Sequence, residues 1–117
     1  MRLFLLINLL ISINFVFSQE LNYVFKSGND GYNCYRIPTI IKAKNGTLLA
    51  FAEARKNSCS DTGDVDIVYK KSFDNGLSWS PLKVIWDDGL NTCGNPSPVL
   101  DYDSGRISLL STWNRGE

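Results

Sequence analysis

The stretch Ser72-Phe73-Asp74-Asn75-Gly76-Leu77-Ser78-Trp79 has the pattern S-x-D-x-G-x-x-W, which is known as an Asp box. Ser72 and Asp74 have short polar side chains that can accept hydrogen bonds from the backbone N–H groups of a turn. Gly76 suits a position with positive φ, where a Cβ atom would be strained. Trp79 offers a large apolar surface that can pack beneath the turn. The pattern predicts a strand–turn–strand unit that serves as scaffold, with an ordinary polar hairpin turn as the alternative.

Six segments of the chain have the composition of β-strands. They are residues 35–44, 47–54, 65–72, 79–86, 97–101 and 106–113. Asn45-Gly46 separates the first two segments, and this dipeptide is the strongest short signal for a β-hairpin. Residues 55–63 and 87–96 are polar or contain Gly and Pro, and they are expected to be loops. Because no segment predicts a helix, the expected fold class is all-β.

The first four predicted strands form a meander of about 50 residues, which is the size of one β-propeller blade. The last two strands resemble the start of a second blade. A blade buries its faces only against neighbouring blades, and a blade and a half cannot close a ring. We therefore expect residues 19–117 to be the N-terminal part of a longer, truncated propeller domain. A small complete β-domain is the alternative.

The first 18 residues predict a secretory signal peptide. Arg2 provides a positive N-terminal region, residues 3–17 are almost wholly apolar, and Val16-Phe17-Ser18 precedes the expected cleavage site. The apolar run of about 15 residues is shorter than the ~20 that a membrane-spanning helix needs. We expect a secreted, periplasmic or cell-surface protein that keeps no transmembrane segment after cleavage.

Charge and composition limit the kinds of site that the chain can form. It has 12 Lys and Arg residues, 12 Asp and Glu residues and no His. No basic run is present to bind nucleic acid. Without His or a C-x-x-C pair, these residues supply no zinc site, no His-based triad and no Cys-His pair, and nothing indicates calcium or another cofactor. Cys34, Cys59 and Cys93 leave three disulfide pairings open, as well as reduced thiols.

Two arginines lie at unusual positions in predicted strands. Arg36 lies in the apolar sequence Y-R-I-P, and Arg55 ends the sequence F-A-E-A-R. Asp61 follows six residues later in a polar loop. A guanidinium group binds carboxylates bidentately, and a nearby carboxylic acid can protonate a leaving group. Taken alone, the chemistry favours a simpler alternative, in which each arginine pairs with a local acid such as Glu53, Asp64 or Asp66.

The order and spacing of Y-R-I-P, F-A-E-A-R, Asp61 and the Asp box resemble the start of the exo-α-sialidase (neuraminidase) family. The resemblance covers residues 31–117. It implies a six-bladed β-propeller of the sialidase type, of which this chain holds the first blade and part of the second. It also implies a retaining glycoside hydrolase that removes terminal sialic acid from glycoproteins, glycolipids or oligosaccharides.

The resemblance implies roles for individual residues. Arg36 matches the first arginine of a triad that binds the sialic acid carboxylate, and Arg55 matches a further arginine near the carboxylate and O4. Asp61 matches the catalytic acid/base. Asn95, in the sequence N-P-S-P, resembles a segment near the N-acetyl pocket, and Trp113 is a weaker match to the same region.

The family's Tyr/Glu nucleophile pair and its other two triad arginines have no counterpart in the chain. We therefore expect these 117 residues alone to lack catalytic activity. One alternative is a non-catalytic sialoglycan-binding propeller, because Asp boxes also occur in lectin-like and receptor propellers. A structural or partner-binding β-domain is a third possibility. Arg36, Arg55 and Asp61 favour the enzyme, since a pure binder has little need of an acid at that spacing.

Overall fold

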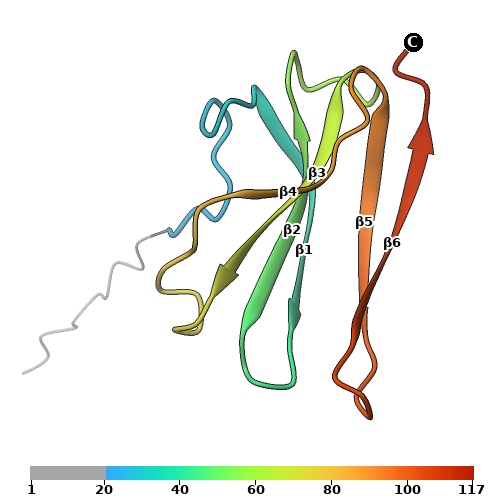
Figure 1. Cartoon of the computed structure of the whole chain (residues 1–117). Helices are drawn as coiled ribbons and strands as arrows, with labels where there is room; N and C mark the ends of the chain where they lie inside the picture. The colour runs from blue at the N-terminus through green and yellow to red at the C-terminus, as the bar shows by residue number, and fades with distance from the viewer. Residues whose placement is uncertain (1–20) are drawn as a thin grey trace, which may run out of the picture.

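The computed structural model describes residues 21–117, which form one sheet of six strands and no helix (Figure 1). The strands are β1 (Cys34–Lys42), β2 (Leu48–Arg55), β3 (Val65–Ser72), β4 (Lys83–Trp86), β5 (Thr92–Leu100) and β6 (Ile107–Asn114). The predicted all-β class is confirmed. The expected signal peptide lies outside the described residues. Within the described part of the chain, no helix is long and apolar enough to cross a membrane.

The strands form a four-stranded antiparallel meander followed by a hairpin. β1, β2, β3 and β4 pair in sequence order, and β5 pairs antiparallel with β6. The two parts are linked by one parallel register pair, Val65 with Thr92. Figure 1 shows β5 and β6 standing beside the first four strands. The arrangement is one propeller blade and the first two strands of the next, as the sequence predicts.

The boundary of β5 differs from the prediction. This strand begins at Thr92 and runs through Pro96, whereas the sequence predicted a loop up to residue 96. The ladder between β5 and β6 is interrupted between Gly94 and Ser97. Because a proline without an N–H is tolerated at such a bulge, Pro96 lies within the strand.

The boundary of β4 also differs, since this strand begins at Lys83 instead of residue 79. The segment between the Asp box and β4 contains Pro81, which cannot donate to the ladder. Ser80 continues the pairing instead. Its N–H donates to the carbonyl of Lys71 at 2.8 Å, and its hydroxyl accepts from the N–H of Lys71 at 3.0 Å.

The core lies along β2 and β3. Its fully buried side chains include Ala52 and Ala54 of β2 and Val65, Ile67 and Val68 of β3. Strands that are buried on both faces belong in the middle of a blade. The flanking strands keep apolar side chains exposed, including Ile40 of β1 (56%), Val99 of β5 (54%) and Leu110 of β6 (61%).

The Asp box forms the turn between β3 and β4. The hydroxyl of Ser72 accepts from the N–H of Gly76 at 2.8 Å and donates to Asp74 Oδ1 at 2.8 Å. Asp74 accepts from the hydroxyl and the N–H of Ser78, and these hydrogen bonds lower the pKa of Asp74 to about 2. Gly76 has a φ of 89°, and a Cβ atom there would contact the ring of Trp79 at 3.8 Å. These contacts stabilise the turn from within. The turn is distant in sequence from Arg36 and Arg55.

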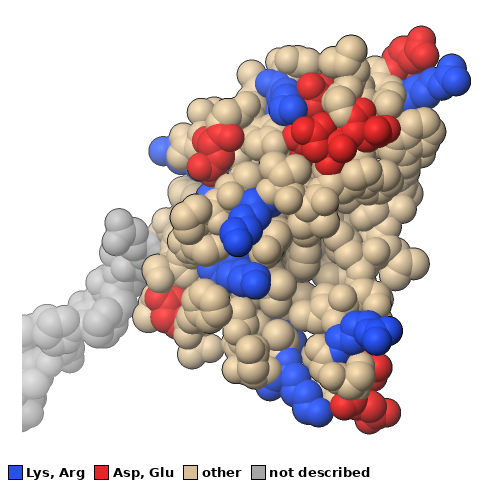
Figure 2. Space-filling view, in the orientation of Figure 1, with Lys and Arg blue, Asp and Glu red and all other residues tan. Residues whose placement is uncertain are grey.

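Charged side chains of both signs are spread over the face of the molecule shown in Figure 2. Acidic side chains gather near the top of this view, and Lys and Arg lie both beside them and further down. That face has no continuous basic surface of the kind that binds a phosphate backbone.

Candidate active site

A polar pocket of about 300 Å³ lies where the first blade meets the second. Its lining comes from β1, β2, the loop of residues 56–64, β5 and β6, and consists of Arg36, Ile37, Glu53, Arg55, Asp61, Thr92, Gly94, Asn95, Thr112 and Asn114. Substrate-binding or catalytic roles are expected from the sequence for Arg36, Arg55, Asp61 and Asn95. The structure brings all four to this one pocket.

Two β-bulges border the pocket, one on each blade. The β1–β2 register shifts between Arg36 and Thr39, and the β5–β6 register shifts between Gly94 and Ser97. In both bulges the residue before a proline has positive φ, with 51° for Ile37 and 52° for Asn95. Non-glycine residues in this conformation are uncommon and concentrate at functional sites. The bulges redirect the two strands at the point where they face the pocket.

Arg36 is exposed at the edge of the pocket. Among residues 21–117, its side chain forms no hydrogen bond and no ion pair. The full donor set of a guanidinium group therefore remains available for a planar anion such as a carboxylate.

Arg55 is buried, with 3% of its side chain exposed, and it is surrounded by acceptors. Nε and Nη2 donate to Glu53 Oε2 at 3.1 and 2.5 Å. Nη1 donates to the carbonyl of Cys59 at 2.6 Å and to Asp61 Oδ1 at 2.8 Å. Burial lowers the pKa of Arg55, but the hydrogen bonds and charges of Glu53 and Asp61 outweigh it and raise the pKa above its ordinary value. Only one of its five N–H groups is left for a ligand.

The sequence left open the alternative that each arginine pairs with a nearby acid. Among residues 21–117, this pairing is found for Arg55 and not for Arg36. The partner of Arg55 is Glu53, one of the three acids considered. The other two, Asp64 and Asp66, contact the ammonium group of Lys56 at 3.4 Å each.

Glu53 is a pocket residue to which sequence reasoning gave no functional role. It is buried, and its second oxygen, Oε1, accepts from the backbone N–H of Asn95 at 2.9 Å. A Cβ atom at Gly94 would lie 2.8 Å from Oε1, so the close approach of the two strands requires glycine there. The spacing of Glu53 and Arg55 in the sequence could have indicated that Glu53 belongs to the pocket. Residues two apart on a strand share a face, so Glu53 must lie beside Arg55.

Asn95 lines the pocket, whereas Trp113 does not. The side-chain amide of Asn95 donates to Thr112 Oγ1 at 2.9 Å, across β5 and β6. Trp113 is 48% exposed, does not line the pocket, and donates its indole N–H to Asp88 at 2.7 Å. Alternation along β6 turns Thr112 and Asn114 toward the pocket and the residue between them away from it.

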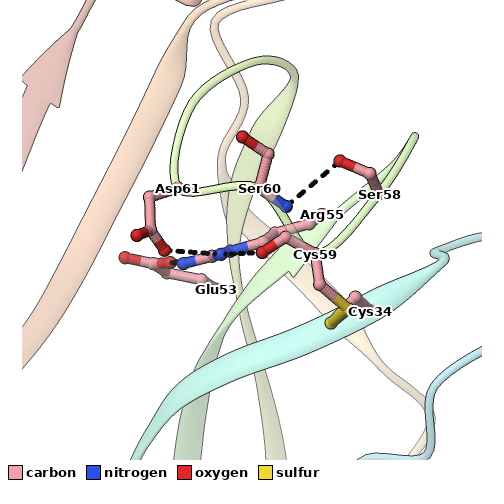
Figure 3. The surroundings of a disulfide bond; sticks show 7 residues. All are labelled: Cys34, Glu53, Arg55, Ser58, Cys59, Ser60 and Asp61. Atoms are coloured by element: carbon pink, nitrogen blue, oxygen red, sulfur yellow. Dashed lines mark hydrogen bonds and ion pairs between the residues drawn. A yellow bond between two sulfur atoms is a disulfide. The ribbon is translucent and has the colours of Figure 1, made fainter.

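A disulfide joins Cys34, the first residue of β1, to Cys59 in the loop that carries Asp61 (Figure 3). This is one of the three pairings that the sequence left open. Cys93 is buried as a free thiol, and burial raises its pKa to about 11. Among residues 21–117 there is no group of three or more His, Cys, Asp or Glu side chains able to hold a metal ion.

No family model matches the chain, but individual proteins do. An exo-alpha-sialidase of Aspergillus fumigatus is 40% identical over 90 residues, which are 72% of this chain and 22% of that protein. A sialidase of Paraclostridium sordellii is 31% identical, with 89% of this chain and 29% of that protein covered. The chain therefore spans between a fifth and a third of the length of these relatives.

Solved sialidase structures share the fold. The Hadza microbial sialidase Hz136 superimposes with a TM-score of 0.71 at 30% identity, over 77% of this chain and 19% of that chain. The NanB sialidase of Streptococcus pneumoniae gives a TM-score of 0.76 at 24% identity, over 85% of this chain and 19% of that chain. By sequence and by fold, the chain is related to the exo-α-sialidase family and corresponds to a part of its propeller.

Proposed function

We propose that this chain supplies one side of the active site of a retaining exo-α-sialidase. The substrates are sialylated glycoproteins, glycolipids or oligosaccharides. The observation that carries the proposal is the pocket between the two blades, in which an exposed arginine with no ion pair to residues 21–117, a buried arginine and an exposed aspartate lie together. A site for an anionic sugar needs a carboxylate-binding cation and a proton donor, and these residues meet both needs.

The residues divide the chemistry between them. Arg36 binds the carboxylate that sialic acid carries on its anomeric carbon. Asp61 protonates the departing glycosidic oxygen and then deprotonates the incoming water. Arg55 donates a hydrogen bond to Oδ1 of Asp61 and so orients this carboxyl group. Asn95, which lines the pocket from β5, would contact the N-acetyl group.

The nucleophile of the proposed reaction is a tyrosine that this chain does not supply. Sialidases use a tyrosine where most retaining glycosidases use a carboxylate. A negative nucleophile would be repelled by the substrate carboxylate, whereas a neutral phenol paired with a glutamate would not. Residues 19–117 therefore supply binding and acid/base groups, and the intact protein carries the activity.

We also propose that the protein is exported. The N-terminal 18 residues have the pattern of a signal peptide, and the Cys34–Cys59 disulfide is of a kind that persists in oxidising compartments.

The experiment compares the full-length protein with its Asp61→Ala variant in release of sialic acid from a natural sialoside. We expect a loss of roughly 10²-fold or more, the scale of a missing general acid. Asp103→Ala is the matched control, because this aspartate is exposed in the turn between β5 and β6 and should leave the rate unchanged. A folded wild-type protein that binds sialoglycans but releases nothing would instead indicate a lectin-like propeller.

A further inference from the structure

The Cys34–Cys59 disulfide lies close in sequence to two residues that line the pocket. Each cysteine precedes a pocket residue by two positions, with Arg36 following Cys34 and Asp61 following Cys59. On a strand, residues two apart share a face, so Cys34 and Arg36 project from the same side of β1. The disulfide closes a 25-residue separation and so links the strand of the carboxylate-binding arginine to the loop of the acid.

Apart from this disulfide, residues 57–62 of the loop 56–64 have few ties to the sheet. Residues 57–62 are all exposed. The base of the loop is closed by a backbone hydrogen bond from the N–H of Lys56 to the carbonyl of Asp64 at 3.1 Å. The hydroxyl of Thr92 also donates to the carbonyl of Gly63 at 2.9 Å, and Lys56 forms an ion pair with Asp66 at 3.4 Å. The hydrogen bonds of Ser60 stay within the loop. One joins it to Ser58 (Figure 3), and others join it to Thr62.

The remaining restraint on residues 57–62 is Arg55, which donates to the carbonyl of Cys59 and to Asp61. The side chain of Asp61 is 84% exposed. An ion pair with one exposed partner is a weak restraint in water. Figure 3 shows the disulfide on one side of the Arg55 guanidinium and Asp61 on the other, so the loop crosses over this arginine between two anchors.

We propose that the Cys34–Cys59 disulfide is a positioning element for proton transfer, because it holds the loop so that Asp61 stays over the pocket. This inference rests on the proposed function. Opening the disulfide leaves the pocket arginines in place, since Arg36 and Arg55 belong to β1 and β2. It therefore weakens delivery of the proton to the leaving group more than binding of the carboxylate.

The dependence on the leaving group separates this role from a purely structural one. A natural sialoside has an alcohol as leaving group, which departs only when protonated, whereas a fluorogenic aryl sialoside releases a stabilised phenolate that needs little protonation. For the full-length Cys34→Ser/Cys59→Ser variant, we expect kcat on the natural sialoside to fall at least about 10-fold further than kcat on the aryl sialoside. KM should change little on either.

Reduction of the disulfide in the wild-type protein is a second test of the same proposal. Mild dithiothreitol treatment should reproduce the selective loss, and it should leave the double serine variant unaffected. Cys93→Ala retains the disulfide and should keep the wild-type ratio of the two rates. Hydrogen exchange should show faster exchange for residues 56–64 on reduction, with β2 unchanged. If the double variant does not fold, reduced wild-type protein with native fluorescence gives the same comparison.

An equal loss on both substrates, or a lower Tm with an unchanged ratio of rates, would overturn the inference and leave the disulfide a stabilising crosslink only. A wild-type protein that is inactive on both substrates would refute the proposed function itself. An active wild-type enzyme with an unchanged ratio refutes only the positioning role.

Discussion

At the residue scale, Arg36 and Arg55 line the same pocket in opposite electrostatic settings. Arg36 is exposed and has no ion pair among the described residues, while Arg55 is buried between Glu53 and Asp61. A buried charge that loses its partner is costly, whereas an exposed one is solvated by water. Replacement of Arg36 should therefore affect substrate binding, and replacement of Arg55 should also affect stability.

Replacing Arg36 should affect binding and leave the fold intact. In Arg36→Lys, the planar fork that matches a carboxylate becomes a single ammonium group. We expect KM for a sialoside to rise by about 10-fold or more, with Tm unchanged. Steady-state kinetics and thermal unfolding check this, with Arg106→Lys on the exposed turn before β6 as the control. An unchanged KM would show that Arg36 does not bind the substrate carboxylate.

Replacing Arg55 should affect the fold as well. Arg55→Ala leaves the carboxylate of Glu53 buried without its ion-pair partner. Breaking a buried pair from one side costs about 3 kcal/mol or more. Chemical denaturation of the full-length protein should show this loss, while Arg106→Ala should show almost none. Equal stability of the two variants would contradict the burial of the Arg55–Glu53 pair.

At the scale of elements, the first blade and the Asp box could be predicted from sequence because their signals are local. Asn45-Gly46 marks the β1–β2 hairpin, and the alternation in residues 65–72 marks β3. The start of β5 could not be predicted, because G-N-P reads as a loop until the bulge that accommodates Pro96 is known.

The candidate site was predictable only in part, for a related reason. Arg36, Arg55, Asp61 and Asn95 belong to recognisable sequence patterns. Glu53 acquires its role from an acceptor contact with the backbone of Asn95, 42 residues away, and the disulfide depends on which cysteine faces Cys34. Such contacts are products of strand pairing, and a single sequence does not specify them.

The Asp box should contribute stability that depends on pH. The folded-state pKa of Asp74 is about 2, below the unfolded value near 3.9. A lowered carboxyl pKa stabilises the fold above the unfolded value, and the stabilisation is lost as the pH falls toward 2. Wild type should therefore exceed Asp74→Asn in Tm at pH 5, and the difference should shrink between pH 4 and pH 2. Asp103→Asn should show no such trend, and activity per folded molecule should be unchanged in both variants.

At the scale of the whole molecule, the described strands have a well-packed middle and apolar outer faces. Ile40, Val99 and Leu110 are each more than half exposed. In a propeller such faces pack against neighbouring blades. The chain also spans only 22% of the Aspergillus relative, so most of that protein has no counterpart in these residues.

Residues 19–117 produced alone should therefore be inactive and should expose apolar surface. We expect no release of sialic acid from either kind of sialoside, together with dye binding or self-association that the full-length protein does not show. Turnover by the isolated piece would show that it needs no outside nucleophile and would contradict the proposed division of roles.

A crystal structure of the full-length protein with an uncleavable sialoside, such as a sulfur-linked analogue, would show directly where the substrate binds. We expect the sugar to lie in the pocket between β1, β2 and β5. Its carboxylate should be about 2.7–2.9 Å from the guanidinium of Arg36, and its glycosidic atom should face Asp61. A sialoside bound away from this pocket, or bound there with its carboxylate turned from Arg36, would contradict the proposed function.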